Sequence, residues 1–114
     1  MEKKVASFFG GGSGGSVDST EYSDSLQIGA ILTGLGYEVR NGGYYGLMEA
    51  VSKGASSSGG RAVGYTCANF GRVVGNKYLS ETVVARDIYD RLRLLIDESS
   101  VIVAVRGSVG TLAE

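Results

Sequence analysis

Clustered glycines carry the clearest chemical signal in this 114-residue sequence. Three glycine-rich segments run from Gly10 to Ser16, from Asn41 to Gly46 and from Arg106 to Thr111. A glycine directly before a helix lets backbone N–H groups approach a phosphate, and the helix N-terminus adds a favourable partial charge. These segments therefore predict contacts with a phosphate-bearing small molecule.

The first segment also contains the letters of the dinucleotide-binding pattern G-x-G-x-x-G, at Gly10, Gly12 and Gly15. However, a tract made almost wholly of glycine matches any glycine pattern. The next expected strand also carries its acidic residue, Glu38, within the strand and not at its end. No Gly-Lys-Ser or Gly-Lys-Thr occurs, so the phosphate-binding P-loop motif is absent from the sequence. Phosphate binding without either fingerprint is the expectation.

The absence of histidine from the sequence excludes several mechanisms. Ser-His-Asp catalysis, Cys-His catalysis and histidine-ligated metals all need an imidazole. The single cysteine, Cys67, cannot form an internal disulfide or supply a structural zinc site alone, and it is expected to be a small buried residue near the end of a strand. Acid–base chemistry must then fall to carboxylates, tyrosine, lysine or arginine.

The overall composition is that of a globular protein, with 43% hydrophobic and 20% charged residues. The longest apolar runs are far shorter than the roughly 20 residues that span a bilayer, and residues 1–15 lack the apolar stretch of a signal peptide. A net charge of −1 gives no strong attraction to nucleic acid or anionic membranes. We expect a cytoplasmic protein that binds neither.

Short apolar runs predict the strands, and each is followed by a turn signal or a helical pattern. The run at 101–105 has no polar alternation, which predicts burial on both faces of a parallel sheet. The expected strands are Val5–Phe9, Tyr37–Arg40, Arg61–Tyr65, a short strand within Tyr78–Val84, and Val101–Val105.

Three helices are expected between these strands. The first follows a capping box of Asp18 and Glu21 and ends near Gly34 or Gly36. Its apolar side is formed by Leu26, Ile28, Gly29, Ile31, Leu32 and Leu35. The second opens after Gly46 and precedes a polar loop at 55–60, with Leu47, Ala50, Val51 and Gly54 on the helical period. The third has Asp87 as its N-cap and turns Ile88, Leu92, Leu95 and Ile96 inward.

The alternation of strand, glycine turn and helix predicts an α/β fold, a Rossmann-like doubly wound parallel sheet with helices on both faces. Such sheets bind ligands beyond the carboxyl ends of their strands. The three glycine-rich segments should therefore converge on one rim. Residues 1–114 are expected to form a single nucleotide-binding domain.

The last nine residues, from Arg106 to Glu114, resemble the P-G-G-x-G-T-x-x-E motif of the Lonely Guy (LOG) family. These are cytokinin-activating phosphoribohydrolases, often labelled lysine decarboxylases. The segment from Asn41 to Val51 is similar to the G-G-G-x-x-G-L-M-G-A-V segment of that family, and Phe9 to Ser13 resembles its first glycine loop. The likeness covers nearly the whole chain. Because the family continues past this motif, the domain is expected to be incomplete at its C-terminus.

The resemblance implies hydrolysis of the N-glycosidic bond of a nucleoside 5′-monophosphate, giving free base and ribose 5-phosphate. It places the catalytic residues at Arg91 and Glu114, whereas Arg93 is expected to point away from the site. It implies no metal or redox cofactor, and pairing as a homodimer. The implied substrate-binding residues are Gly11, Gly12, Ser13, Gly42, Gly43, Gly46, Met48, Gly107, Gly110 and Thr111.

Several positions depart from the family pattern. Arg106 replaces the proline, Ser108 the second glycine, and Leu92 the lysine that usually follows the arginine; Glu49 stands where glycine is frequent. An alternative reading is therefore a non-catalytic module on the same fold that binds a nucleotide or carries the molybdenum cofactor.

Overall fold

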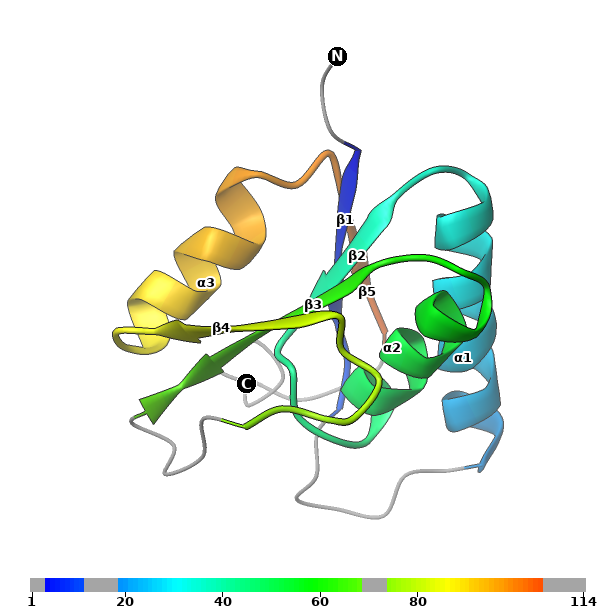
Figure 1. Ribbon diagram of the computed structural model, residues 1–114, viewed down its shortest axis with the longest axis horizontal. Coiled ribbons are helices and arrows are strands. Elements are labelled where there is room, and N and C mark those ends of the chain that lie inside the picture. Colours follow the sequence, from blue (N-terminus) through cyan, green and yellow to red (C-terminus); the bar gives the residue numbers. More distant parts are fainter. Residues whose placement is uncertain (1–3, 12–18, 69–73, 106–114) are drawn as a thin grey trace.

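The computed structural model describes residues 4–11, 19–68 and 74–105 (Figure 1). Strands and helices alternate along the chain apart from one pair of consecutive strands, as the sequence pattern predicts. The elements are β1 (Val5–Phe9), α1 (Ser19–Gly34), β2 (Glu38–Asn41), α2 (Leu47–Ser57), β3 (Ala62–Cys67), β4 (Glu81–Ala85), α3 (Ile88–Asp97) and β5 (Val101–Ala104).

The strands form one parallel sheet in the order β4-β3-β2-β1-β5. Ser7 of β1, which lies between β2 and β5, is in register with Arg40 of β2 and with Ile102 of β5. Helices α1 and α2 cover one face of the sheet and α3 lies on the other (Figure 1). The predicted Rossmann-like fold with helices on both faces is confirmed.

A hydrophobic core lies on each side of the sheet. The larger one, under α1 and α2, contains Ala6, Phe8, Leu32, Val39, Leu47, Val51, Ala55 and Ala62. The smaller one, under α3, contains Phe9, Val63, Tyr65 and Leu95. Strands β1, β2 and β3 are buried along their whole length, which fixes the positions at which their carboxyl ends open onto the rim.

Helices α1 and α2 touch backbone to backbone at two glycines. A Cβ added at Gly29 would lie 2.1 Å from the carbonyl oxygen of Val51, and one at Gly54 would lie 1.9 Å from that of Leu26. Because this contact turns the Gly29 side of α1 inward, Ile31 and Leu35 are exposed. The expectation that both residues belong to the buried side of the helix was wrong.

Three further expectations need correction. Strand β5 lies at the edge of the sheet with Ile102 half exposed, so it is not buried on both faces. Ile96 of α3 is 42% exposed, whereas Leu95 is buried. Helix α2 continues through residues 55–57, where a loop was expected, because Ala55 packs into the core. Asp87 caps α3 as predicted, accepting from the Asp90 N–H at 2.8 Å; Asp18 lies outside the described residues.

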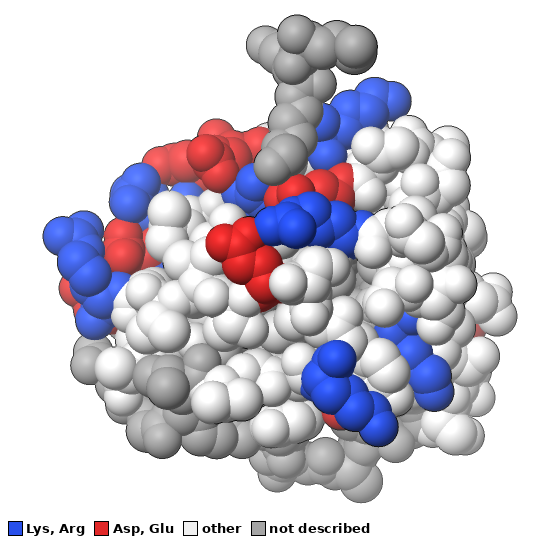
Figure 2. Space-filling view, viewed as in Figure 1, with Lys and Arg blue, Asp and Glu red and all other residues white. Residues whose placement is uncertain are grey.

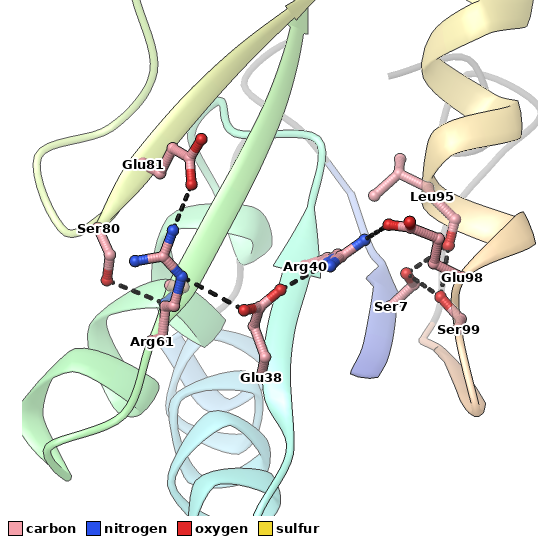
Figure 3. Close-up of polar contacts among 10 residues, drawn as sticks. Ser7, Glu38, Arg40, Arg61, Ser80, Glu81, Leu95, Glu98 and Ser99 are labelled. Atoms are coloured by element: carbon pink, nitrogen blue, oxygen red, sulfur yellow. Dashed lines mark hydrogen bonds and ion pairs between the residues drawn. The ribbon is translucent and has the colours of Figure 1, made fainter. Parts of the chain in front are cut away.

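Ion pairs link the amino-terminal ends of the strands (Figure 3). Glu38 at the start of β2 contacts Arg40 at 2.7 Å and Arg61 at 3.3 Å. Arg61 also pairs with Glu81, and Arg40 with Glu98. Figure 2 shows charged side chains gathered in the upper half of the molecule, where these strands begin. This network therefore lies at the opposite end of the sheet from the carboxyl-end rim, and we assign it to holding strands and α3 together.

No helix in the described parts of the chain is long and apolar enough to cross a membrane.

Candidate functional site

The carboxyl ends of β1 and β5 and the start of α2 meet at one rim of the sheet. The backbone N–H of Val105 donates to the Phe9 carbonyl at 2.9 Å, and that of Leu47 donates to the Gly11 carbonyl at 3.0 Å. A Cβ added at Gly10 would lie 2.9 Å from Cγ2 of Val105. The described start of the first glycine segment therefore lies beside the second, as predicted, and the end of β5 reaches the same rim. Residues 106–111 themselves lie outside the described part.

The loop between β2 and α2 has a backbone shape that requires glycine. Gly43 and Gly46 have φ angles of 82° and 69°, which side-chain-bearing residues rarely adopt. A Cβ at Gly43 would also lie 3.2 Å from the Cα of Gly64 on β3. The fully buried Asn41 braces the turn by accepting from the Gly43 N–H at 2.7 Å and donating to Ser52 Oγ at 2.8 Å.

Asn76 holds the same loop from the other side. Its backbone N–H donates to the Gly43 carbonyl at 2.8 Å. Its side-chain amide donates to the carbonyls of Gly43, at 3.2 Å, and Tyr44, at 2.8 Å. Since Asn76 is 5% exposed, these bonds satisfy carbonyls that water reaches poorly. The sequence pattern did not identify this residue.

Arg91 extends from α3 to the loop between β2 and α2. It is 1% exposed; Nε donates to the Tyr65 carbonyl at 2.5 Å and Nη2 to the Gly42 carbonyl at 3.0 Å. Its guanidinium carbon lies 5.3 Å from the centroid of the Tyr44 ring. Arg91 is thus the inward-facing arginine of α3, whereas Arg93 is exposed and pairs with Asp90 and Asp97. The catalytic role of Arg91 stays a prediction.

Tyr44 connects the loop to the end of β3. Its ring is buried, and its hydroxyl accepts from the Cys67 N–H at 3.0 Å and donates to the Cys67 carbonyl at 3.3 Å. Cys67 is itself fully buried at the last position of β3, as expected. Tyr44 therefore packs within the protein, and its ring is not free to stack on a base.

Helix α2 begins at the rim with no side chain capping its first turn. The N-cap residue is Gly46, which has no side chain to cap the first turn. The positive end of the helix dipole therefore faces the rim without a capping side chain. Met48, in the first turn, is 2% exposed, and its carbonyl accepts from Ser52 Oγ at 2.9 Å. Met48 supports the loop through packing and can offer a ligand only its backbone N–H.

A hollow of about 250 Å³ opens beside this helix start. It is lined by Glu21, Asp24, Ser25, Leu47 and Val105. Next to it, Tyr22 donates from its hydroxyl to Glu49 Oε2 at 3.0 Å and so joins α1 to α2. Partial burial, together with the hydrogen bond and the negative charge of Glu49, raises the pKa of Tyr22 to about 12.

The described substrate-binding residues of the prediction lie near one another at the carboxyl-end rim, although Gly42, Gly43 and Met48 are buried. Gly11, Gly42, Gly43, Gly46 and Met48 all belong to the rim or to the loop that shapes it. The others lie outside the described residues: Gly12, Ser13, Gly107, Gly110, Thr111 and the second catalytic candidate, Glu114. No group of three or more metal-ligating His, Cys, Asp or Glu side chains occurs within the part that the structure describes.

Comparison with known families identifies the family of this chain. The model of the SLOG cluster4 family matches residues 4–114. The chain belongs to the SLOG cluster4 family. The resemblance to Lonely Guy proteins is confirmed at the level of the LOG-like SLOG superfamily, which contains this family and its structural neighbours.

Solved structures share the fold of this SLOG protein. TM1055, a structural genomics target, is 33% identical with a TM-score of 0.83; the match covers 97% of this chain and 65% of TM1055. The molybdenum cofactor carrier protein of Chlamydomonas reinhardtii is 24% identical over 98% of this chain and 71% of its own, with a TM-score of 0.80. The molybdenum cofactor binding protein of Rippkaea orientalis is 22% identical over 97% and 67%, with a TM-score of 0.84.

An uncharacterized protein of Archaeoglobus fulgidus is 27% identical over 106 residues, which cover 88% of this chain and 65% of that relative. The SLOG chain thus spans just under two thirds of the length of this relative and of TM1055.

Proposed function

We propose that this SLOG cluster4 protein binds a phosphate-bearing small molecule at the rim and holds it without cleaving it. The observation that carries the proposal is the set of contacts that Arg91 makes inside the protein. Its guanidinium donates to the carbonyls of Tyr65 and Gly42 and lies against Tyr44, so it braces the binding loop from within. An arginine engaged in this way is a positioning residue, because it shapes the surface on which a ligand rests.

The phosphate would rest on backbone N–H groups. Gly46 leaves the first turn of α2 without a side-chain cap, and the helix dipole favours an anion there. The positive φ angles of Gly43 and Gly46, held by Asn41 and Asn76, fix the loop before a ligand arrives. A preformed loop lowers the ordering cost of binding. Gly107, Gly110 and Thr111 would complete the cradle.

The structural neighbours lend support to one ligand class. Two of them are a carrier and a binding protein for the molybdenum cofactor, which supports a nucleotide or a phosphate-bearing pterin as the cargo of this chain. Arg106 and Ser108 stand where the Lonely Guy motif has a proline and a glycine, and this departure fits a binding role better than a hydrolytic one. A homodimeric state and a cytoplasmic location remain predictions.

Phosphoribohydrolase activity is the second candidate. It is favoured by the presence of both catalytic residue types at the family positions, Arg91 and Glu114. Glu114 would bind the ribose and stabilise the oxocarbenium character that develops at the sugar. Arg91 would then orient the ribose and that carboxylate through its fixed set of donors.

A binding and turnover experiment separates the two candidates. AMP, GMP and molybdenum cofactor released from a molybdoenzyme are titrated calorimetrically into the protein, and the nucleotide mixtures are analysed chromatographically for free base. The proposal predicts binding with no base released. Catalytic release of base, abolished by Glu114→Gln, would replace it with the hydrolase.

Two variants that each add a carboxylate test whether the ligand binds at the rim. Gly11→Asp places a carboxylate beside the start of α2 and should weaken nucleotide binding by at least about tenfold through repulsion of the phosphate. Gly34→Asp adds the same charge at the exposed end of α1, where nothing lies within 4 Å, and should leave affinity unchanged. Equal effects of the two variants would place the ligand elsewhere.

A further inference from the structure

The outer side of α1 exposes aliphatic residues that a single chain leaves uncovered. Ile31 and Leu35 are each 59% exposed and lie one helical turn apart. Ile28, one turn before Ile31, is partly buried. Scattered exposed hydrophobic residues are ordinary on a protein surface, whereas neighbouring ones form a patch of the kind that marks an interaction site. The fold of one chain does not account for this patch.

The same part of α1 lacks charged residues. None occurs from residue 25 to residue 37, although charged residues make up 20% of the sequence. Figure 2 shows the right flank of the molecule, over α1, as a largely uncharged surface. Depletion of charged residues distinguishes the centre of a protein–protein interface from the rest of a protein surface. This flank therefore has the composition of a contact surface.

Helix α1 cannot rotate to bury these residues. A Cβ added at Gly29 would lie 2.1 Å from the Val51 carbonyl oxygen, so α1 and α2 are in backbone contact on a different side of the helix. A rotation that turned Ile31 inward would bring side chains into this contact, where there is room only for glycine. The exposure of Ile31 and Leu35 is therefore fixed by the packing of the two helices.

Four residues on this side of α1 have the spacing of a helix–helix contact. They are Asp24, Ile28, Ile31 and Leu35. Steps of four, three and four residues keep a stripe on one side of a helix turned toward a partner helix, as in a coiled coil. We call this stripe the α1 seam. Its apolar residues follow the pattern of a packed helix, but no helix in the described part of the chain covers them.

The two ends of the α1 seam carry opposite charges. Asp24, at one end, is exposed and makes no ion pair with any described residue. Lys4 lies at the other end, where its Nζ donates to the Leu35 carbonyl at 3.4 Å, and it also pairs with no described carboxylate. Eleven residues separate Asp24 from Leu35, a distance of about 16 Å along the helix axis. The seam is therefore apolar in the middle, acidic at one end and basic at the other.

We propose that the α1 seam is an interface between two copies of this chain, with the two helices antiparallel about a two-fold axis. Such an interface is reciprocal, because each contact occurs twice. An axis midway between residues 28 and 31 sets Ile28 of each copy against Ile31 of the other. The same axis brings Asp24 of each copy to Leu35 of the other, beside Lys4. Parallel pairing would instead set Asp24 against Asp24.

This inference does not depend on ligand binding at the rim. The exposed aliphatic residues lie in the second half of α1, which ends beside Lys4 at the amino-terminal ends of the strands. The inference names a surface and an orientation, which the expectation of a homodimer leaves open. One helix from each copy makes a smaller contact than the roughly 800 Å² per partner of a standard interface, so the dimer should dissociate on dilution.

Sedimentation equilibrium of the whole chain without ligand measures this assembly. The average mass should rise with concentration from 11.8 kDa toward twice that value. Ile31→Glu and Leu35→Glu change exposed positions, so each monomer should still fold. Each should weaken the dimer by at least about tenfold, because a charge would enter the apolar contact. Ile96→Glu on α3, where the residue is 42% exposed, is the matched control and should leave the dissociation constant unchanged.

An exchange of charges tests the antiparallel orientation. Asp24→Lys and Lys4→Asp, each made alone, would set like charges against each other at both ends of the seam. Each should weaken the dimer by about tenfold. The double variant exchanges the two charges and should return the dissociation constant to that of the wild type, because opposite charges face each other again. Circular dichroism and thermal unfolding verify that every variant is folded.

Each unfavourable result overturns a definite part of the inference. A mass of one chain at every concentration would overturn self-association and leave the seam to a different partner. A dimer that survives Ile31→Glu, or that Ile96→Glu weakens equally, would place the interface elsewhere. A dimer that is lost in Ile31→Glu but does not respond to the single charge changes would overturn the antiparallel pairing.

Discussion

Arg91 and Tyr44 lie against each other beneath the binding loop, with the guanidinium carbon 5.3 Å from the ring centroid. One residue comes from α3 and the other from the β2–α2 loop, so the contact joins that helix to the carboxyl-end rim. The same guanidinium bonds the carbonyl of Gly42, directly before the first positive-φ glycine of that loop. The far helix therefore takes part in setting the shape of the rim.

Arg91→Lys tests this relationship. An ammonium group cannot reproduce the fork that reaches both Tyr65 and Gly42, so a buried carbonyl is left unsatisfied. The free energy of unfolding should fall by about 1–3 kcal/mol, measured by urea denaturation. Arg93→Lys, at an exposed position two residues along, should change it by less than about 0.5 kcal/mol. A similar loss in both variants would remove Arg91 from its role in the loop.

Asn76→Ala should loosen the loop without altering the helices. The substitution removes the donor to the carbonyls of Gly43 and Tyr44, at a cost of about 1–3 kcal/mol. Amide hydrogen exchange should accelerate at Gly43, whose geometry Asn76 holds, more than in β1. Lys77→Ala, next in sequence and exposed, serves as the control. Uniform acceleration across the sheet would indicate general destabilisation and no specific clamp.

Gly54→Ala should be among the most destabilising single changes in α2. The new Cβ would lie 1.9 Å from the Leu26 carbonyl oxygen, so α1 and α2 would have to separate, at a cost of more than about 2 kcal/mol. Gly34→Ala, with nothing within 4 Å, should be neutral or slightly stabilising. Thermal unfolding of the two variants gives the comparison, and an unchanged melting temperature for Gly54→Ala would contradict the close contact.

The Tyr22–Glu49 hydrogen bond predicts a loss of stability at high pH. The folded protein holds the pKa of Tyr22 at about 12, above its usual value of 10.0, so between these values the folded state binds a proton that the unfolded state has released. This contribution to stability is complete below pH 10 and is lost as the pH rises toward 12. Glu49→Gln should shift the Tyr22 titration toward 10, observed by NMR of the labelled phenol carbon. A titration of Tyr22 at its ordinary pKa in the wild type would disprove the pairing.

The local sequence predicted the elements that depend on local signals. Asp87 caps α3, the positive-φ Gly46 precedes α2, and the apolar run at residues 5–9 forms β1. What it missed depends on contacts between distant segments. Gly29 is buried because it meets α2, and this contact leaves the more hydrophobic Ile31 in solvent.

The candidate site divides in the same way. The glycines of the β2–α2 loop were identifiable because their positive φ angles are a local requirement. Asn76 was not, because its partners lie more than 30 residues earlier in the chain.

The most direct test of the rim is an NMR titration of the isotopically labelled protein with GMP, followed through the backbone amides. We expect saturable shifts at Gly11, Gly46 and Met48, where the phosphate would bind, and no comparable change along α3. Shifts confined to α3 or to the amino-terminal ends of the strands, or none at millimolar ligand, would contradict a ligand site at this rim.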